Sequence, residues 1–134
     1  MTDTHLPTVT PAEAKTFTGE DLVVVADIYV EPGYDAEEGP SIEMDILHPE
    51  LRDNAVWPED IGHESGQRLR CQVCGQHLRY ASEAVHKPSN RGLFIGRECA
   101  HHIHGLRGLT TLDMKRLKQR LHARQRFHKL AEDR

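Results

Sequence analysis

The spacing of hydrophobic and polar positions predicts strands in the first half of this 134-residue chain. Residues 22–30 (LVVVADIYV) are rich in β-branched side chains and end just before a Pro-Gly pair, which predicts a strand. Over residues 42–47 apolar side chains alternate with acidic ones, which predicts a second strand that pairs with the first. We predict that residues 48–69 form an acidic connector with one helical turn near Glu50. Residues 1–20 are predicted to be a mobile N-terminal segment.

In the second half, the pattern predicts a hairpin and then helices. Residues 78–86 have strand character, 87–92 (KPSNRG) form a strong turn signal, and 93–95 predict a short strand. A final helix is predicted over about 112–131, a stretch without proline or glycine that begins after the capping residue Thr110.

Composition points to a small hydrophobic core. Only 37% of the residues are hydrophobic and 5% aromatic, so a metal cross-link would help the chain to fold. No apolar run approaches the roughly 20 residues that span a bilayer. Three cysteines are an odd number, which argues against a disulfide framework and for a reducing compartment. We therefore expect a cytoplasmic protein.

Charge divides the chain into two unlike halves. Residues 1–66 contain sixteen acidic and two basic residues, a net charge of −14. Residues 67–134 contain fifteen basic and five acidic residues, a net charge of +10. Such halves can present different surfaces to different partners, or they can attract each other within the fold. Both interpretations stay open at this point.

Three cysteines carry the clearest chemical signal in the sequence. Cys71 and Cys74 are two residues apart and are followed by glycine, the spacing of a tight turn that directs two sulfurs at one cation. Cys99 supplies a third thiolate. A redox-active pair is the main chemical rival, but such a pair normally opens a helix after a strand. The spacing therefore predicts a structural Zn²⁺ site rather than three unrelated thiols.

The fourth zinc ligand is predicted to be His102, because residues three apart on a helix share one face and Cys99 is expected to begin a helix. His101 and His104 compete with it, and His77 and His86 are further alternatives. Three thiolates and one imidazole leave no open position on zinc, which fits a structural role. If water were the fourth ligand instead, catalysis would become possible.

These elements together predict an α+β protein. A turn with two cysteines, a hairpin, and a helix with the last ligands follow the order of a treble-clef zinc unit, and a C-terminal helix comes after it. We divide the chain into a mobile segment (1–20), an acidic β-containing region (21–66), and a zinc unit with the basic helix (67–134).

The sequence also offers two further functions, nucleic-acid binding and nuclease activity, although a charged helix face is often merely exposed to solvent. Basic residues that share one stripe of the final helix could contact nucleic-acid phosphates; they are Lys115, Lys118, Arg126 and Lys129. His86, Asn90 and His102 or His104 occur in the order of a His-Asn-His nuclease, although the gap from His86 to Asn90 is short for such enzymes. The sequence shows no catalytic triad, phosphate-binding loop or metalloprotease motif, so we assign no catalytic residues.

The stretch C-x2-C-G-x2-L-R-Y, followed by G-x2-C-A, resembles small treble-clef or zinc-ribbon-like proteins of actinobacteria and their bacteriophages, most without an assigned activity. The resemblance covers about residues 68–106 and implies a structural metal held by Cys71, Cys74 and Cys99. We therefore expect a non-enzymatic, zinc-stabilised binding module, of a phage regulatory or host-directed type. Its partner would be a host or phage protein, contacted through the charged surfaces and the last helix. A nucleic-acid binder and an HNH-like nuclease remain the alternatives.

Overall fold

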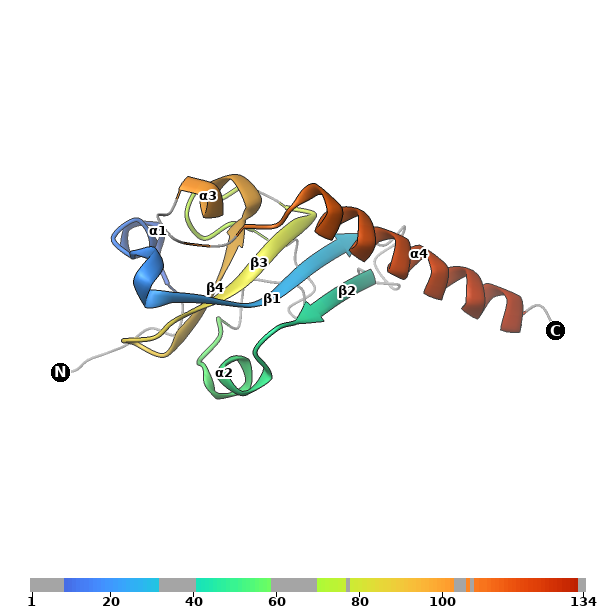
Figure 1. The fold of residues 1–134 in the computed structure, drawn as a ribbon, viewed down its shortest axis with the longest axis horizontal. Helices are drawn as coiled ribbons and strands as arrows, with labels where there is room; N and C mark the ends of the chain where they lie inside the picture. Colours follow the sequence, from blue (N-terminus) through green and yellow to red (C-terminus); the bar gives the residue numbers. More distant parts are fainter. Residues whose placement is uncertain are drawn as a thin grey trace.

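A computed structural model of the chain describes residues 9–31, 41–58, 70–76, 78–102, 106 and 108–132, with side chains up to Phe127. Its centre is a four-stranded antiparallel sheet in the order β2-β1-β3-β4 (Figure 1). The strands are β1 (Leu22–Glu31), β2 (Ser41–Ile46), β3 (Tyr80–His86) and β4 (Arg91–Gly96). The helices are α1 (Pro11–Ala14), the short 3₁₀ helix η1 (Gly19–Asp21), α2 (Pro49–Asn54), α3 (Arg97–His102) and α4 (Thr111–Glu132).

The structure confirms an α+β fold and the pairing of the two predicted strands of the first half. β1 lies antiparallel to β2, with Ile28 opposite Met44. On its other side β1 pairs with β3, with Ile28 opposite Ala81, so that one sheet unites the acidic and the basic half of the chain. As a central strand, β1 is buried along most of its length, which explains its nearly continuous apolar sequence.

Helices cover the two faces of the sheet unequally. Figure 1 shows α1, α3 and α4 on one side of the sheet and α2 on the other. Beneath α4, the side chains of Leu117 and Leu121 pack against Tyr29. On the α2 side, Trp57 packs with Ile28 and Phe94. Among the described residues, none of the helices has both the length and the apolar character needed to cross a membrane.

The predicted start of the last helix is confirmed by its cap. The Asp113 amide donates to the Thr110 hydroxyl over 3.0 Å, and the Thr110 amide donates to the Asp113 carboxylate, also over 3.0 Å. This reciprocal pair satisfies backbone donors that have no partner inside the helix. From there α4 runs along the sheet and continues beyond it towards the C-terminus (Figure 1).

The two charge halves do attract each other within the fold. Arg120 of α4 donates to Asp45 over 2.6 Å and to Glu43 over 2.9 Å, both on β2. Arg124 donates to Glu43 over 2.5 Å. The acidic positions that alternate with apolar ones in β2 therefore face a basic helix rather than open solvent.

Part of the predicted mobile N-terminal segment is instead packed against the sheet. Val9 and Ala14 are each 1% exposed and belong to a buried cluster with Leu22. The helix α1 begins with a capping box between Thr10 and Glu13. Residues 9–20 therefore contribute two helical turns and part of the core, while residues 1–8 lie outside the described residues. These few apolar side chains show no periodicity, so only the tertiary contacts reveal their place in the core.

Candidate metal centre

The first part of the centre is a tight turn that begins at Cys71. The Gly75 amide donates to the Cys71 carbonyl over 2.7 Å, and the Cys71 amide donates to the Gln76 carbonyl over 2.9 Å. Gly75 has a φ of 79°, in the left-handed region that side chains rarely adopt. The glycine after Cys74 thus allows the chain to turn back, as the sequence indicated.

Gln72 fastens this turn to the edge strand of the sheet. Its backbone amide donates to the Phe94 carbonyl, and its side-chain oxygen accepts from the Phe94 amide, each over 2.8 Å. Its side-chain nitrogen donates to the Val9 carbonyl over 2.9 Å. Sequence reasoning missed this buried residue, because no local pattern shows that a glutamine between two cysteines will form hydrogen bonds with the backbone of β4.

The third cysteine comes from the first turn of α3, directly after β4 ends. Gly96 is the last residue of β4, and a Cβ at this position would lie 2.9 Å from the nearest Leu78 methyl carbon. The absence of a side chain at Gly96 lets Leu78 and the turn approach the start of α3 closely. Ala100 is fully buried beside Cys99 and fixes this short helix against the core.

The three cysteines meet at one point. The sulfur atoms of Cys71, Cys74 and Cys99 lie within 4.8 Å of one another. Cys71 is buried, Cys99 is half-buried and Cys74 is exposed, so the cluster lies at the surface with one side open to solvent. The sequence-predicted thiolates are therefore brought together as expected, and they could hold a metal ion.

The surroundings favour a thiolate at one cysteine and disfavour a second charge beside it. Burial alone raises the pKa of Cys71, but backbone amides that donate to its sulfur outweigh burial and lower that pKa. These amides belong to Gly96, Cys74 and Val73. Burial, followed by hydrogen bonds to the other two cysteines, raises the pKa of Cys99 to about 12. A divalent cation would remove this conflict, because it neutralises the charges of neighbouring thiolates. The donor set therefore fits a thiolate-binding metal.

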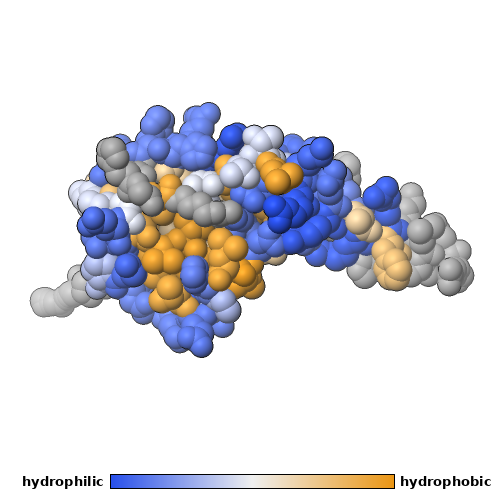
Figure 2. Space-filling model, viewed as in Figure 1, coloured by the Kyte–Doolittle hydropathy of each residue, from blue (hydrophilic) through white to orange (hydrophobic). Residues whose placement is uncertain are grey.

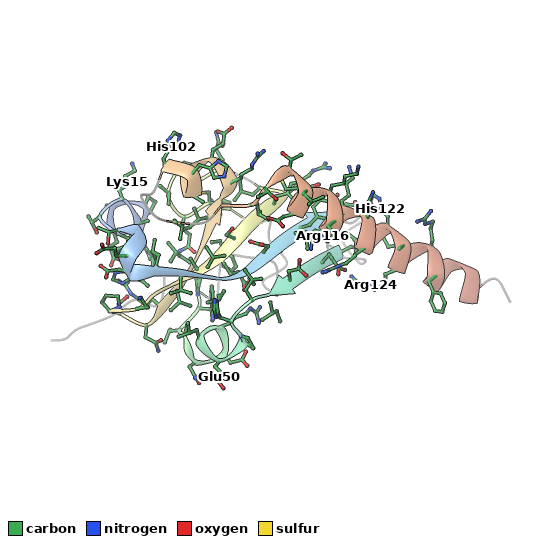
Figure 3. All side chains as sticks on the ribbon, in the orientation of Figure 1. Lys15, Glu50, His102, Arg116, His122 and Arg124 are labelled. Atoms are coloured by element: carbon green, nitrogen blue, oxygen red, sulfur yellow. The ribbon has the colours of Figure 1, made fainter. Side chains whose placement is uncertain are left out.

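The histidine predicted as fourth ligand lies beside the cluster but outside it. His102 is the last residue of α3, is exposed, and lines a cavity of about 460 Å³ together with Cys74 and Cys99. Figure 3 shows His102 on the outer side of α3. The neighbouring His101 ring lies against Gly108, where a Cβ would come within 2.2 Å of it. His77 and His104 lie outside the described residues.

Two residues of the predicted nuclease motif, His86 and Asn90, lie at the end of the β3–β4 hairpin that is remote from the cysteines. His86 stacks on Phe17 with 3.8 Å between ring centroids and contacts the Ser89 hydroxyl over 2.7 Å, and burial lowers its pKa. Asn90 donates to the Asn54 carbonyl over 2.8 Å. Because a strand rises about 3.3 Å per residue, His86 lies roughly 20 Å from Tyr80, at the end of β3 that adjoins α3. The fold does not bring these groups to the cysteines.

The basic residues predicted for nucleic-acid contact lie on α4. Lys115, Lys118 and Arg126 are exposed and form no salt bridge with another described residue. Lys129 lies within α4, but its side chain is outside the described set.

No family model, no curated protein and no solved structure matches this chain. The function must therefore be argued from the chemistry and geometry of its own residues.

Proposed function

We propose that the chain is a non-enzymatic binding module whose fold is cross-linked by a structural zinc ion. The observation that supports the metal is the meeting of three cysteine sulfurs within 4.8 Å, with backbone amides directed at one of them. Thiolates are soft ligands that zinc binds tetrahedrally in structural sites. All three cysteines are free, and free thiolates require a reducing environment, which supports the proposed cytoplasmic location.

The order of the elements supports a treble-clef arrangement. A cysteine turn, the hairpin of β3 and β4, and a cysteine in the first turn of α3 follow one another along the chain. A metal bound there would connect the turn near Gln72 to α3 across the end of β4. We retain His102 as the proposed fourth ligand, because it borders the same cavity as Cys74 and Cys99. A change of its side-chain rotamer would be needed to complete the site.

Metal analysis under reducing conditions tests this part. We expect one zinc ion per chain and a tetrahedral thiolate spectrum after cobalt substitution, both lost in Cys71→Ser. His102→Ala should shift the cobalt absorption bands, whereas the matched control His101→Ala should leave them unchanged. Protein that contains no metal, or a cobalt spectrum without sulfur-to-metal bands, would refute the zinc centre. An unchanged spectrum in His102→Ala would refute only the fourth ligand.

The observation that supports protein binding is an apolar surface on the α2 side of the sheet. Four large hydrophobic side chains there are between 38% and 51% exposed. They are Ile46, Leu47, Leu51 and Val56, and we call them the α2 patch. Figure 2 shows a contiguous hydrophobic surface over this side of the molecule. Contiguous apolar surface of this kind commonly marks an interaction site, and a host or phage protein remains the proposed partner.

Substitutions in the α2 patch test the proposed contact. A tagged protein should retain a stoichiometric partner from an actinobacterial lysate, and Leu51→Asp should lose it. Leu112→Asp is the matched control, because Leu112 is 64% exposed on α4, away from α2. Both variants should keep their zinc and their circular dichroism spectrum. Equal retention by wild type and Leu51→Asp would show that the α2 patch is not the contact surface.

A further inference from the structure

Five cations of α4 fall into two sets with different surroundings, and a sixth, Arg116, lies 3.7 Å from Asp113 of the same helix. Arg120 and Arg124 point to β2 and are held by Glu43 and Asp45, as described above. Their guanidinium groups also donate to the carbonyls of Met44 and Ile42. These two arginines therefore hold the helix on the sheet, and their charges are largely compensated within the molecule.

The second set is directed away from β2. Lys115, Lys118 and Arg126 are exposed, and no described acidic residue lies within salt-bridge distance of them. At 100° per residue they fall within a sector of about 80°, and they span roughly 16 Å along the helix axis. Glu31, which is paired with His122, is near enough to Lys118 to offset part of its charge. Lys115 and Arg126 therefore contribute the most uncompensated charge on this face.

Two of the three aromatic residues of this half, Tyr80 and Phe94, are not available for stacking on bases. Tyr80 stacks on Tyr29 with 4.6 Å between ring centroids, and Phe94 is 4% exposed beside Trp57. Among the described residues of the basic half, Phe127 is the exposed aromatic side chain, at 72%. Proteins that bind single strands without sequence preference rely on several such rings. The charge on α4 is therefore suited to phosphates rather than to unpaired bases.

We propose that the outer face of α4, defined by Lys115, Lys118 and Arg126, binds double-stranded DNA through its phosphate backbone. Duplex DNA carries one negative charge per roughly 1.7 Å of its axis, so a row of uncompensated cations can neutralise several phosphates and release their counterions. Figure 1 shows that α4 continues beyond the sheet, so a long rod-like partner can approach it. We expect the contact to be independent of sequence, because phosphate contacts carry no sequence information. This function is separate from the α2 patch, which lies on the other side of the sheet.

Fluorescence anisotropy with a labelled 20-base-pair duplex, measured on the full zinc-loaded protein from 25 to 200 mM KCl, tests the proposal. If three phosphates are neutralised, the slope of log K against log salt is about −2.7, and affinity falls roughly 40-fold between 50 and 200 mM. Lys115→Gln/Arg126→Gln should reduce the slope by about 1.8 and weaken binding at 50 mM about tenfold or more. Lys15→Gln/Lys87→Gln, an equal charge change at exposed sites outside α4, should bind like wild type.

Several results would overturn the proposal. These are no binding by wild type at 25 mM KCl, equal losses in the α4 variant and its control, or tighter binding to a single strand or an acidic peptide than to the duplex. Circular dichroism and zinc content establish that each variant is folded. Leu51→Asp should retain DNA binding, so failure of the α2 patch and failure of the α4 face can be told apart.

Discussion

At the scale of single residues, one buried ion pair shows how strongly tertiary context acts on this chain. Glu83 lies in the middle of β3 and is 1% exposed. Arg52 comes from α2, which packs on the same face of the sheet, and its Nε lies 2.5 Å from the carboxylate. The Arg52 carbonyl in turn accepts from the Trp57 indole over 2.8 Å. A charge buried this deeply is tolerated only because it is paired.

Removing one partner of this pair should be costly. We expect Arg52→Met to lower the free energy of unfolding by about 3–5 kcal/mol, because it leaves the Glu83 carboxylate buried without its cation. The double variant Arg52→Met/Glu83→Leu should recover most of the loss, because neither charge remains. Urea denaturation at pH 7 measures both. A double variant as unstable as Arg52→Met would show that packing, and not the unpaired charge, dominates.

At the scale of elements, α4 is held on the sheet by both apolar and charged contacts. Leu117 and Leu121 are buried against Tyr29. Arg120 and Arg124, which are paired with β2, lie along one border of this apolar contact. On the other border, the Tyr29 hydroxyl donates to Glu31 over 2.6 Å, and His122 contacts the same carboxylate over 2.6 Å. A 22-residue helix with so few apolar positions depends on such contacts to dock.

The two sets of cations on α4 should differ in their effect on stability. Arg120→Ala should cost about 1–2 kcal/mol, since it removes charged hydrogen bonds to two carboxylates but acts at a side chain that is 40% exposed. Arg126→Ala, on the same helix, should stay within about 0.5 kcal/mol of wild type. Urea denaturation at low salt compares them. Equal losses of stability in the two variants would contradict the division of the α4 cations into a set paired with β2 and a set exposed to solvent.

Acid should weaken the docking of α4 through Glu31. The hydrogen bond from Tyr29 outweighs burial, and with His122 it lowers the pKa of Glu31 below its ordinary value of 4.5. A carboxyl group with a lowered folded-state pKa stabilises the fold above its unfolded pKa and loses this contribution as the pH falls through the folded pKa. Wild type should therefore lose more stability than Glu31→Gln as the pH is lowered from 5 to 3.

Denaturation curves across that pH range measure the difference. Glu50→Gln is the control, because Glu50 is exposed on α2 and forms no salt bridge with another described residue. An acid dependence of Glu31→Gln equal to that of wild type would show that Glu31 does not couple the helix to the sheet.

At the scale of the whole molecule, the candidate metal centre connects segments that the sheet alone does not join. Cys71 belongs to the same buried cluster as Leu22 and Leu93, so the cysteine turn is part of the core. Cys99 brings in α3, which leads on to α4. A metal bound here would act as a cross-link in a protein with a small apolar core.

Removing the metal should lower the melting temperature. At free zinc a thousandfold above its dissociation constant, binding contributes about 4 kcal/mol, which corresponds to more than about 10 °C for a chain of this size. A chelator should remove this stabilisation, and added zinc should restore it. In Cys71→Ser the chelator should have little further effect. A melting temperature insensitive to chelation in wild type would contradict a structural metal.

Local patterns were sufficient to predict the strands, the capped start of α4 and the meeting of the three cysteines. The strands and the cap depend on residues close in sequence, on β-branched runs and a Thr-x-x-Asp pair. The place of Cys99, 25 positions after Cys74, was predicted from the donors that zinc requires. The alternation of β2 was also recognised, but its acidic face was not assigned a partner. The open question of the two charge halves was answered by Arg120 and Glu43, which are 77 positions apart.

The sequence by itself therefore determined the elements and the three cysteines that could hold a metal, because helix and strand propensities and the type of each donor are properties of the residues themselves. Only the tertiary structure decided which cations of α4 remain uncompensated, where Glu83 finds its counter-ion, and which apolar side chains of the α2 patch stay exposed. These outcomes depend on contacts between distant segments, and such contacts exist only once the sheet has brought both halves of the chain together.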